Sequence, residues 1–88
     1  MIHLTGTMNC PPDRVDAVRA ALPDHIKLTR SELGCIRFDV TETAPGVFAV
    51  DELFTDRPAF EAHQIRGASS QWAKATAGLP RDYITADE

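Results

Sequence analysis

Several features that commonly reveal a protein's class are scarce in this sequence. The 88 residues include only two cysteines, Cys10 and Cys35, which form neither a disulfide framework nor a CxxC metal site. No apolar run approaches the roughly 18 residues of a membrane-spanning helix, and no stretch has the pattern of a secretory signal. The net charge is −4, so the chain lacks the basic excess that favours nucleic acid or anionic membranes. We therefore expect a cytoplasmic protein without nucleic-acid or membrane partners.

Patterns that bind cofactors are missing as well. The chain has no glycine-rich phosphate loop, no clustered histidine and cysteine ligands and no lysine placed for a Schiff base. The acidic pairs Asp51-Glu52 and Asp87-Glu88 do not have the spacing of a metal site. We expect neither a metal nor an organic cofactor, and we interpret both cysteines as structural or incidental thiols.

The composition is that of one small globular domain covering residues 1–88, with 43% hydrophobic and 25% charged residues. The chain contains no internal repeat, low-complexity segment or linker. A protein of this length buries only about 60–65% of its unfolded surface, so its core is thin. Association with a second subunit would therefore stabilise it.

Hydrophobic periodicity predicts four strands, over residues 2–9, 35–42, 47–54 and 81–86. In the second strand, alternation places Ile36, Phe38 and Val40 on one face. The turn Ala44-Pro45-Gly46 predicts that the second and third strands form an antiparallel hairpin.

Two helical regions separate these strands. The first is predicted over residues 13–31, where Pro23 is expected to kink or split the helix and Gly34 follows its end. Its apolar stripe comprises Val15, Val18, Leu22, Ile26 and Thr29 or Leu33. The second region begins after Asp56, breaks at Gly67 and continues over residues 68–77.

The resulting order, β–α–β–β–α–β, is the ferredoxin-like pattern of the α+β class. In this fold an antiparallel sheet carries its helices on one face. Several strands have apolar or small residues on both faces, so the uncovered face is expected to meet a second subunit. A closed two-fold homodimer is the commonest solution.

One carboxylate on the third strand indicates a possible site. Glu52 shares a strand face with three large apolar residues, Phe48, Val50 and Phe54. An unpaired buried charge is costly, so Glu52 must be paired, hydrogen-bonded or at a cavity wall. His63 follows eleven positions later, about two helical turns beyond the predicted N-cap Asp56, and returns over the same region. We predict that at least one of the two lines a cavity bounded by Phe54 and Trp72.

Three segments resemble the antibiotic biosynthesis monooxygenase family, which includes quinol monooxygenases and related small dimeric α/β-barrel proteins. They are EL-GC-IRFDV from Glu32, FAVDELFTD from Phe48 and AFEAH from Ala59. The matching positions are Glu32, Gly34, Cys35, Phe38, Val40, Phe48, Glu52, Phe54, Asp56, Ala59, Phe60 and His63. Leu33 stands where the family often has proline, and Phe54 replaces a frequent tryptophan or tyrosine. The segment QIRGASSQW after His63 has no close match.

This resemblance implies a homodimer with a pocket between sheet and helices in each subunit. Some members oxygenate quinols or polycyclic aromatic phenols without metal, flavin or haem. Their chemistry would be deprotonation of an electron-rich phenol, followed by direct reaction of the anion with dioxygen. In this chain His63 would be the base and Glu52 would orient the histidine or the substrate hydroxyl. The residues that would wall the pocket are Phe54, Trp72, Phe38 and Tyr83.

Structural roles for the same residues remain open. His63 would merely hydrogen-bond Glu52 or water, Glu52 would anchor a helix or subunit interface, and Trp72 would belong to the core or interface. His3 and His25 are predicted to be surface or edge residues.

Two other functions are alternatives to the monooxygenase. Haem-degrading relatives share the fold, but their asparagine, tryptophan and histidine do not match the order here. The main alternative is a non-oxygenase dimer that binds a small ligand or isomerises it.

Overall fold

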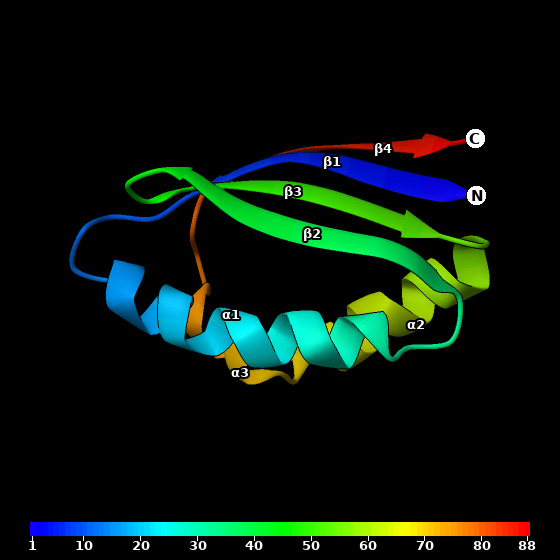
Figure 1. Ribbon diagram of the computed structural model, residues 1–88, viewed down its shortest axis with the longest axis horizontal. Coiled ribbons are helices and arrows are strands. Elements are labelled where there is room, and N and C mark those ends of the chain that lie inside the picture. The colour runs from blue at the N-terminus through cyan, green and yellow to red at the C-terminus, as the bar shows by residue number, and fades with distance from the viewer.

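The computed structural model describes all 88 residues. They form a four-stranded antiparallel sheet with all of the helices on one face (Figure 1). The sheet order is β2-β3-β1-β4. The predicted ferredoxin-like α+β fold is thereby confirmed. None of the helices combines the length and the apolar character that crossing a membrane requires. The elements are β1 (Ile2–Asn9), α1 (Val15–Arg30), β2 (Cys35–Ala44), β3 (Val47–Phe54), α2 (Arg57–Ala68), α3 (Gln71–Ala75) and β4 (Arg81–Asp87).

The first helix is continuous through its internal proline. Pro23 does not split α1, although it removes one backbone donor from the helix. Val18 and Thr29, on either side of the proline, are fully buried and hold both halves of the helix against neighbouring elements. Of the two residues proposed to end the apolar stripe, Thr29 does so. Leu33 lies beyond the helix with 96% of its surface exposed.

A β-bulge changes which residues of β2 face the helices. The pairing with β3 shifts between Cys35 and Arg37, so one extra residue is inserted there. Ile36 is that residue and remains 51% exposed, whereas Phe38 and Val40 are buried. The prediction that all three share one face was therefore wrong for Ile36.

Local signals set both ends of α2. The Asp56 side chain accepts a hydrogen bond from the Ala59 amide at 2.9 Å, which is the N-cap expected for this position. At the other end, α2 runs through Gly67 to Ala68, and the break before α3 comes at residues 69–70. The Ser70 side chain then caps α3 by accepting from the Ala73 amide. The interruption was predicted, but it falls slightly later than Gly67.

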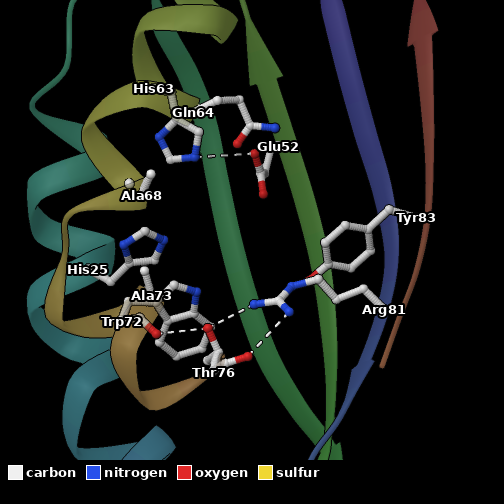
Figure 2. Close-up of a pocket in the computed structure, with 11 residues that line it drawn as sticks. His25, Glu52, His63, Gln64, Ala68, Trp72, Ala73, Thr76, Arg81 and Tyr83 are labelled. Atoms are coloured by element: carbon white, nitrogen blue, oxygen red, sulfur yellow. Dashed lines mark hydrogen bonds and ion pairs between the residues drawn. The ribbon is translucent and has the colours of Figure 1, made fainter. Parts of the chain in front are cut away.

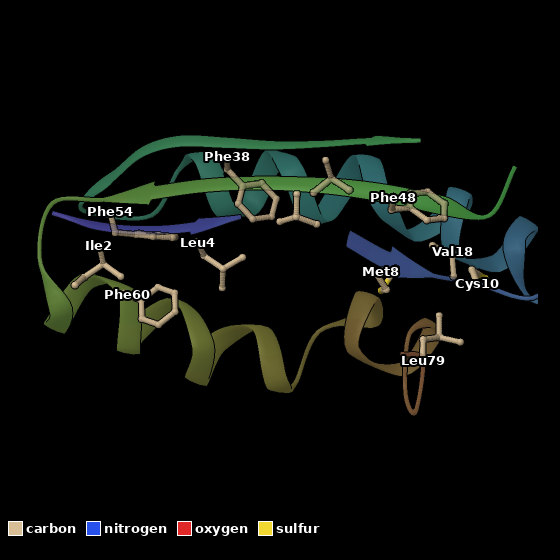
Figure 3. Packing of buried hydrophobic residues seen from close by; sticks show 12 residues of the cluster. Ile2, Leu4, Met8, Cys10, Val18, Phe38, Phe48, Phe54, Phe60 and Leu79 are labelled. Carbon is tan, nitrogen blue, oxygen red and sulfur yellow. The ribbon is translucent and has the colours of Figure 1, made fainter. Parts of the chain in front are cut away.

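The core lies between the sheet and the helices (Figure 3). Phe38, Phe48 and Phe54 are its largest fully buried side chains. The twelve core residues are Ile2, Leu4, Met8, Cys10, Val18, Phe38, Val40, Phe48, Val50, Phe54, Phe60 and Leu79. Glu52 is on the same face of β3 as Phe48, Val50 and Phe54, as the alternation predicts, and is only 7% exposed. The sheet thus carries a carboxylate into an otherwise apolar layer.

Candidate functional site

A cavity of about 220 Å³ lies between the sheet and the three helices (Figure 2). Glu52 comes from β3 and His63 from α2, and the two side chains point toward one another at one end of the view. Tyr83 and Arg81 project from β4 on the sheet side. The residues that line the cavity are His25, Glu52, His63, Gln64, Gly67, Ala68, Trp72, Ala73, Thr76, Arg81 and Tyr83.

The structure divides the predicted site residues into two groups. Glu52, His63, Trp72 and Tyr83 line the cavity. Phe54 and Phe38 do not, because both rings are buried in the core behind His63. The Phe54 ring stacks on the His63 imidazole with centroids 5.0 Å apart, and the Phe38 ring lies 5.6 Å from it. These two phenylalanines therefore pack against the histidine and do not form part of the cavity wall.

Glu32, in the connection between α1 and β2, holds one side of the histidine. Its Oε1 lies 2.7 Å from Nδ1 of His63, and its Oε2 accepts a hydrogen bond from Nε of Arg66 at 2.9 Å. Burial alone would raise the pKa of Glu32, but the hydrogen bonds from Arg66 and His63 outweigh it and lower that pKa. An ionised carboxylate only accepts, so the proton of His63 belongs on Nδ1. Its Nε2 is then free to accept.

The free nitrogen faces the second carboxyl group. Nε2 of His63 lies 3.6 Å from Oε1 of Glu52, and this oxygen is buried without any hydrogen-bond partner in the chain. Burial, reinforced by the charges of Glu32 and Asp51, raises the pKa of Glu52 to about 7. A substantial share of Glu52 therefore stays protonated at neutral pH, whereas Glu32 is ionised. Two carboxyl groups on either side of one imidazole thus differ in protonation state.

The imidazole itself is neutral at physiological pH. Burial lowers the pKa of His63 more than the hydrogen bond from its ring to Glu32 raises it. A neutral imidazole with a free nitrogen can accept a proton, and the neighbouring Glu52 can hold or release one. The site therefore has the groups that general acid–base chemistry needs.

His25 is the residue that sequence reasoning misplaced. The prediction of a surface position was wrong, since His25 is only 6% exposed and lines the cavity. Its ring stacks on the Trp72 indole with centroids 5.1 Å apart and planes at 5°, and burial lowers its pKa to about 4. Its Nδ1 has no hydrogen-bond partner. The spacing of Val18, His25 and Thr29 would have placed it on the buried stripe.

Two further groups from β4 complete the wall. Arg81 is held by Thr76, whose hydroxyl and carbonyl oxygens accept from its guanidinium at 2.8 and 3.3 Å. Tyr83 pairs with Gly6 of β1, where an added Cβ would lie 2.8 Å from the tyrosine ring and 2.0 Å from the Asp82 carbonyl oxygen. Only glycine allows this close approach. Burial raises the pKa of Tyr83, so its hydroxyl remains a donor at neutral pH.

No three His, Cys, Asp or Glu side chains are arranged to hold a metal ion. The cavity instead combines acid–base groups at the Glu52 end with the aromatic side chains of Trp72 and His25, which stack on each other. An aromatic ligand with a hydroxyl group would suit both parts, since its ring would pack against these aromatic side chains and its hydroxyl would hydrogen-bond the unpartnered oxygen of Glu52.

Comparison with known proteins gives an independent view of this architecture. Residues 1–75 match the family model described as antibiotic biosynthesis monooxygenase. A provisionally named antibiotic biosynthesis monooxygenase from Nitrosomonas europaea is similar at 20% identity and a TM-score of 0.84, covering 100% of this chain and 98% of that chain. Rv0793 from Mycobacterium tuberculosis is similar at 26% identity and 0.77, covering 99% and 93%. SO0527 from Shewanella oneidensis is similar at 24% identity and 0.78, covering 99% and 89%. No curated protein matches.

Proposed function

Because this chain belongs to the antibiotic biosynthesis monooxygenase family, we propose that it is a cofactor-independent monooxygenase acting on a quinol or polycyclic aromatic phenol. The observation that carries the proposal is the pair formed by neutral His63 and the unpartnered carboxyl of Glu52 in one cavity. His63 is the general base and Glu52 orients the substrate hydroxyl. Trp72 and Tyr83 contact the ring, and Phe54 and Phe38 support the histidine from the core.

The first step is proton transfer. The substrate hydroxyl donates its proton to Nε2 of His63, and the negative charge of Glu32 stabilises the imidazolium that forms 2.7 Å away. Protonated Glu52 donates a hydrogen bond to the phenolate oxygen. This hydrogen bond takes the place of those that water would donate to the phenolate in solution. A phenolate transfers electrons to dioxygen far more readily than a phenol does.

The second step consumes dioxygen. A ring carbon of the phenolate bonds to dioxygen and forms a peroxide. The C–H bond at this carbon then breaks as the O–O bond breaks, so that one oxygen atom stays on the ring as a carbonyl. The other oxygen atom leaves as water, with the proton from the ring carbon and the proton that His63 took from the phenol. For a phenol the overall change is phenol plus dioxygen to quinone plus water. Both electron pairs that reduce dioxygen come from the substrate, so no external reductant takes part.

The cavity volume limits how much of the substrate is enclosed. An apolar cavity of about 150 Å³ holds one benzene molecule, so 220 Å³ accommodates one substituted ring or slightly more. The reacting ring of a polycyclic phenol would lie inside, and its other rings would extend through the opening.

We further propose that the protein is a cytoplasmic homodimer. The helices cover one face of the sheet and leave the other bare (Figure 1). Ile84, on the bare face of β4, is 69% exposed. Pairing two such faces would bury this apolar surface and enlarge the thin core.

A second candidate is a non-oxygenase member that binds a small ligand or isomerises it. The specific observation in its favour is the 3.6 Å separation between Nε2 of His63 and Oε1 of Glu52. Two such groups would pass a proton between two positions of a ligand without dioxygen. The small volume of the cavity suits such a ligand equally well.

Oxygen uptake separates the two functions. The purified protein would be incubated with a panel of hydroquinones, naphthols and polycyclic phenols, with His63→Ala as the control. Enzyme-dependent uptake of one dioxygen per quinone formed, with one oxygen atom from labelled dioxygen in the product, supports the monooxygenase. Saturable binding of a panel member without any oxygen uptake above the buffer rate supports the second candidate.

A further inference from the structure

Behind His63 a chain of polar side chains connects α1, the loop after it and α2. Arg66 donates from Nη2 to the Thr29 hydroxyl at 2.8 Å and from Nε to Oε2 of Glu32 at 2.9 Å. Oε1 of Glu32 then lies 2.7 Å from Nδ1 of His63. Each carboxylate oxygen therefore has a different, fixed partner.

Stability is a weak explanation for this arrangement. Glu32 and Arg66 are half-buried, with side chains 17% and 29% exposed. Desolvating two charges offsets most of their attraction, and apolar residues often stabilise such a position equally well. The consequence for His63 is clearer, because a group that only accepts hydrogen bonds decides which ring nitrogen carries the proton.

We propose that Glu32 is the positioning residue of the site, held by Arg66 so that His63 keeps its proton on Nδ1 and directs Nε2 to the cavity. Two carboxyl groups compete for the proton of this imidazole. Glu32 is closer, at 2.7 Å against 3.6 Å for Glu52, and its second oxygen is held by a guanidinium. If the proton moved to Nε2, His63 would donate to Glu52 and lose its ability to act as a base. The effect on catalysis rests on the function proposed above, whereas the tautomer does not.

Glu32→Gln tests this role because Arg66 can only donate. The glutamine oxygen must then turn to Arg66, which leaves its NH2 group facing His63. Nδ1 would have to accept from that NH2, and the proton would move to Nε2. The substitution is therefore expected to invert the tautomer while hardly changing the shape of the side chain.

The tautomer can be read directly from long-range ¹H–¹⁵N correlation spectra of protein labelled in histidine. The wild type should show a protonated Nδ1 and an unprotonated Nε2 for His63, and Glu32→Gln should show the reverse. Glu32→Asp keeps a carboxylate acceptor and should retain the wild-type pattern. Glu61→Gln makes the same charge change at an exposed position of α2 and serves as the matched control. Thermal melting would show that each variant is folded.

Activity adds a second readout. On a panel substrate, Glu32→Gln should lower kcat at least about a hundredfold with little change in KM, as when a base is held in the wrong tautomer.

A wild-type protein with its proton on Nε2, or a folded Glu32→Gln variant with an unchanged tautomer, overturns the inference. So does an inverted tautomer with full turnover. Should Glu32→Gln fail to fold, the wild-type and Glu32→Asp spectra decide the matter. An inverted tautomer in a protein that never consumes dioxygen would support the role of Glu32 and refute the monooxygenase.

Discussion

Replacing Glu52 by glutamine is expected to stabilise the protein at neutral and alkaline pH. The carboxyl is 7% exposed, its Oε1 has no hydrogen-bond partner, and its pKa is raised from 4.5 to about 7. Between these two values the folded state binds more protons than the unfolded state, so stability falls as the pH rises. Glutamine has nearly the same shape but never ionises, and its amide can donate to the free nitrogen of His63.

The magnitude follows from the difference between the two pKa values. One pKa unit corresponds to about 1.4 kcal/mol, so Glu52 destabilises the fold by roughly 3 kcal/mol at pH 7 and above. At pH 5 the folded carboxyl is protonated and the unfolded one is only partly ionised, which reduces the cost to about 1 kcal/mol or less. The stability advantage of Glu52→Gln over the wild type should therefore grow with rising pH and reach a plateau near pH 8.

Urea unfolding at intervals between pH 5 and pH 8 would measure this. The useful quantity is the difference in free energy of unfolding between variant and wild type, because contributions common to both proteins, such as the titration of His25, cancel. Glu61→Gln, on the exposed side of α2, is the control and should show almost no difference. A difference that does not change with pH would show that folding leaves the pKa of Glu52 unshifted. A variant less stable than wild type at pH 8 would show that Glu52 is ionised and paired in the folded state.

Three other predictions concern the neighbours of Glu52 and the assembly. His63→Ala should reduce turnover by about 10²–10⁴-fold without changing the mass measured by light scattering, and an unchanged rate would remove His63 as the base. His25→Phe should keep the stack on Trp72 and abolish the acid destabilisation from His25, whose pKa is lowered to about 4. The stability of the wild type is expected to fall as the pH drops from 6.5 to 4, because His25 binds a proton in the unfolded state before it does so in the folded state. A His25→Phe variant whose stability depends on pH as strongly as that of the wild type would contradict this. Light scattering at micromolar concentration should give the mass of a dimer, and a stable monomer would count against pairing through the bare sheet face.

Local sequence determined most of the scaffold. Alternating side chains defined β1 and β3 to the residue, and Asp56 marked the start of α2, because these signals act between residues close together in the chain. The same alternation showed that Glu52 enters the apolar face of β3. The order of the elements also predicted the ferredoxin-like fold, which the four-stranded antiparallel sheet confirms.

Tertiary packing decided the chemistry of the site. Glu32 stands 31 positions before His63 and matched a family segment, but nothing local indicated that its carboxylate would meet the imidazole. The stack of His25 on Trp72 and the core positions of Phe54 and Phe38 depend on how the helices lie across the sheet. Burial and charge at these meeting points place the pKa of Glu52 near 7, whereas that of Glu32 is lowered. Secondary structure depends on neighbours in the chain, but a protonation state depends on every charge and apolar surface that folding brings within a few ångströms.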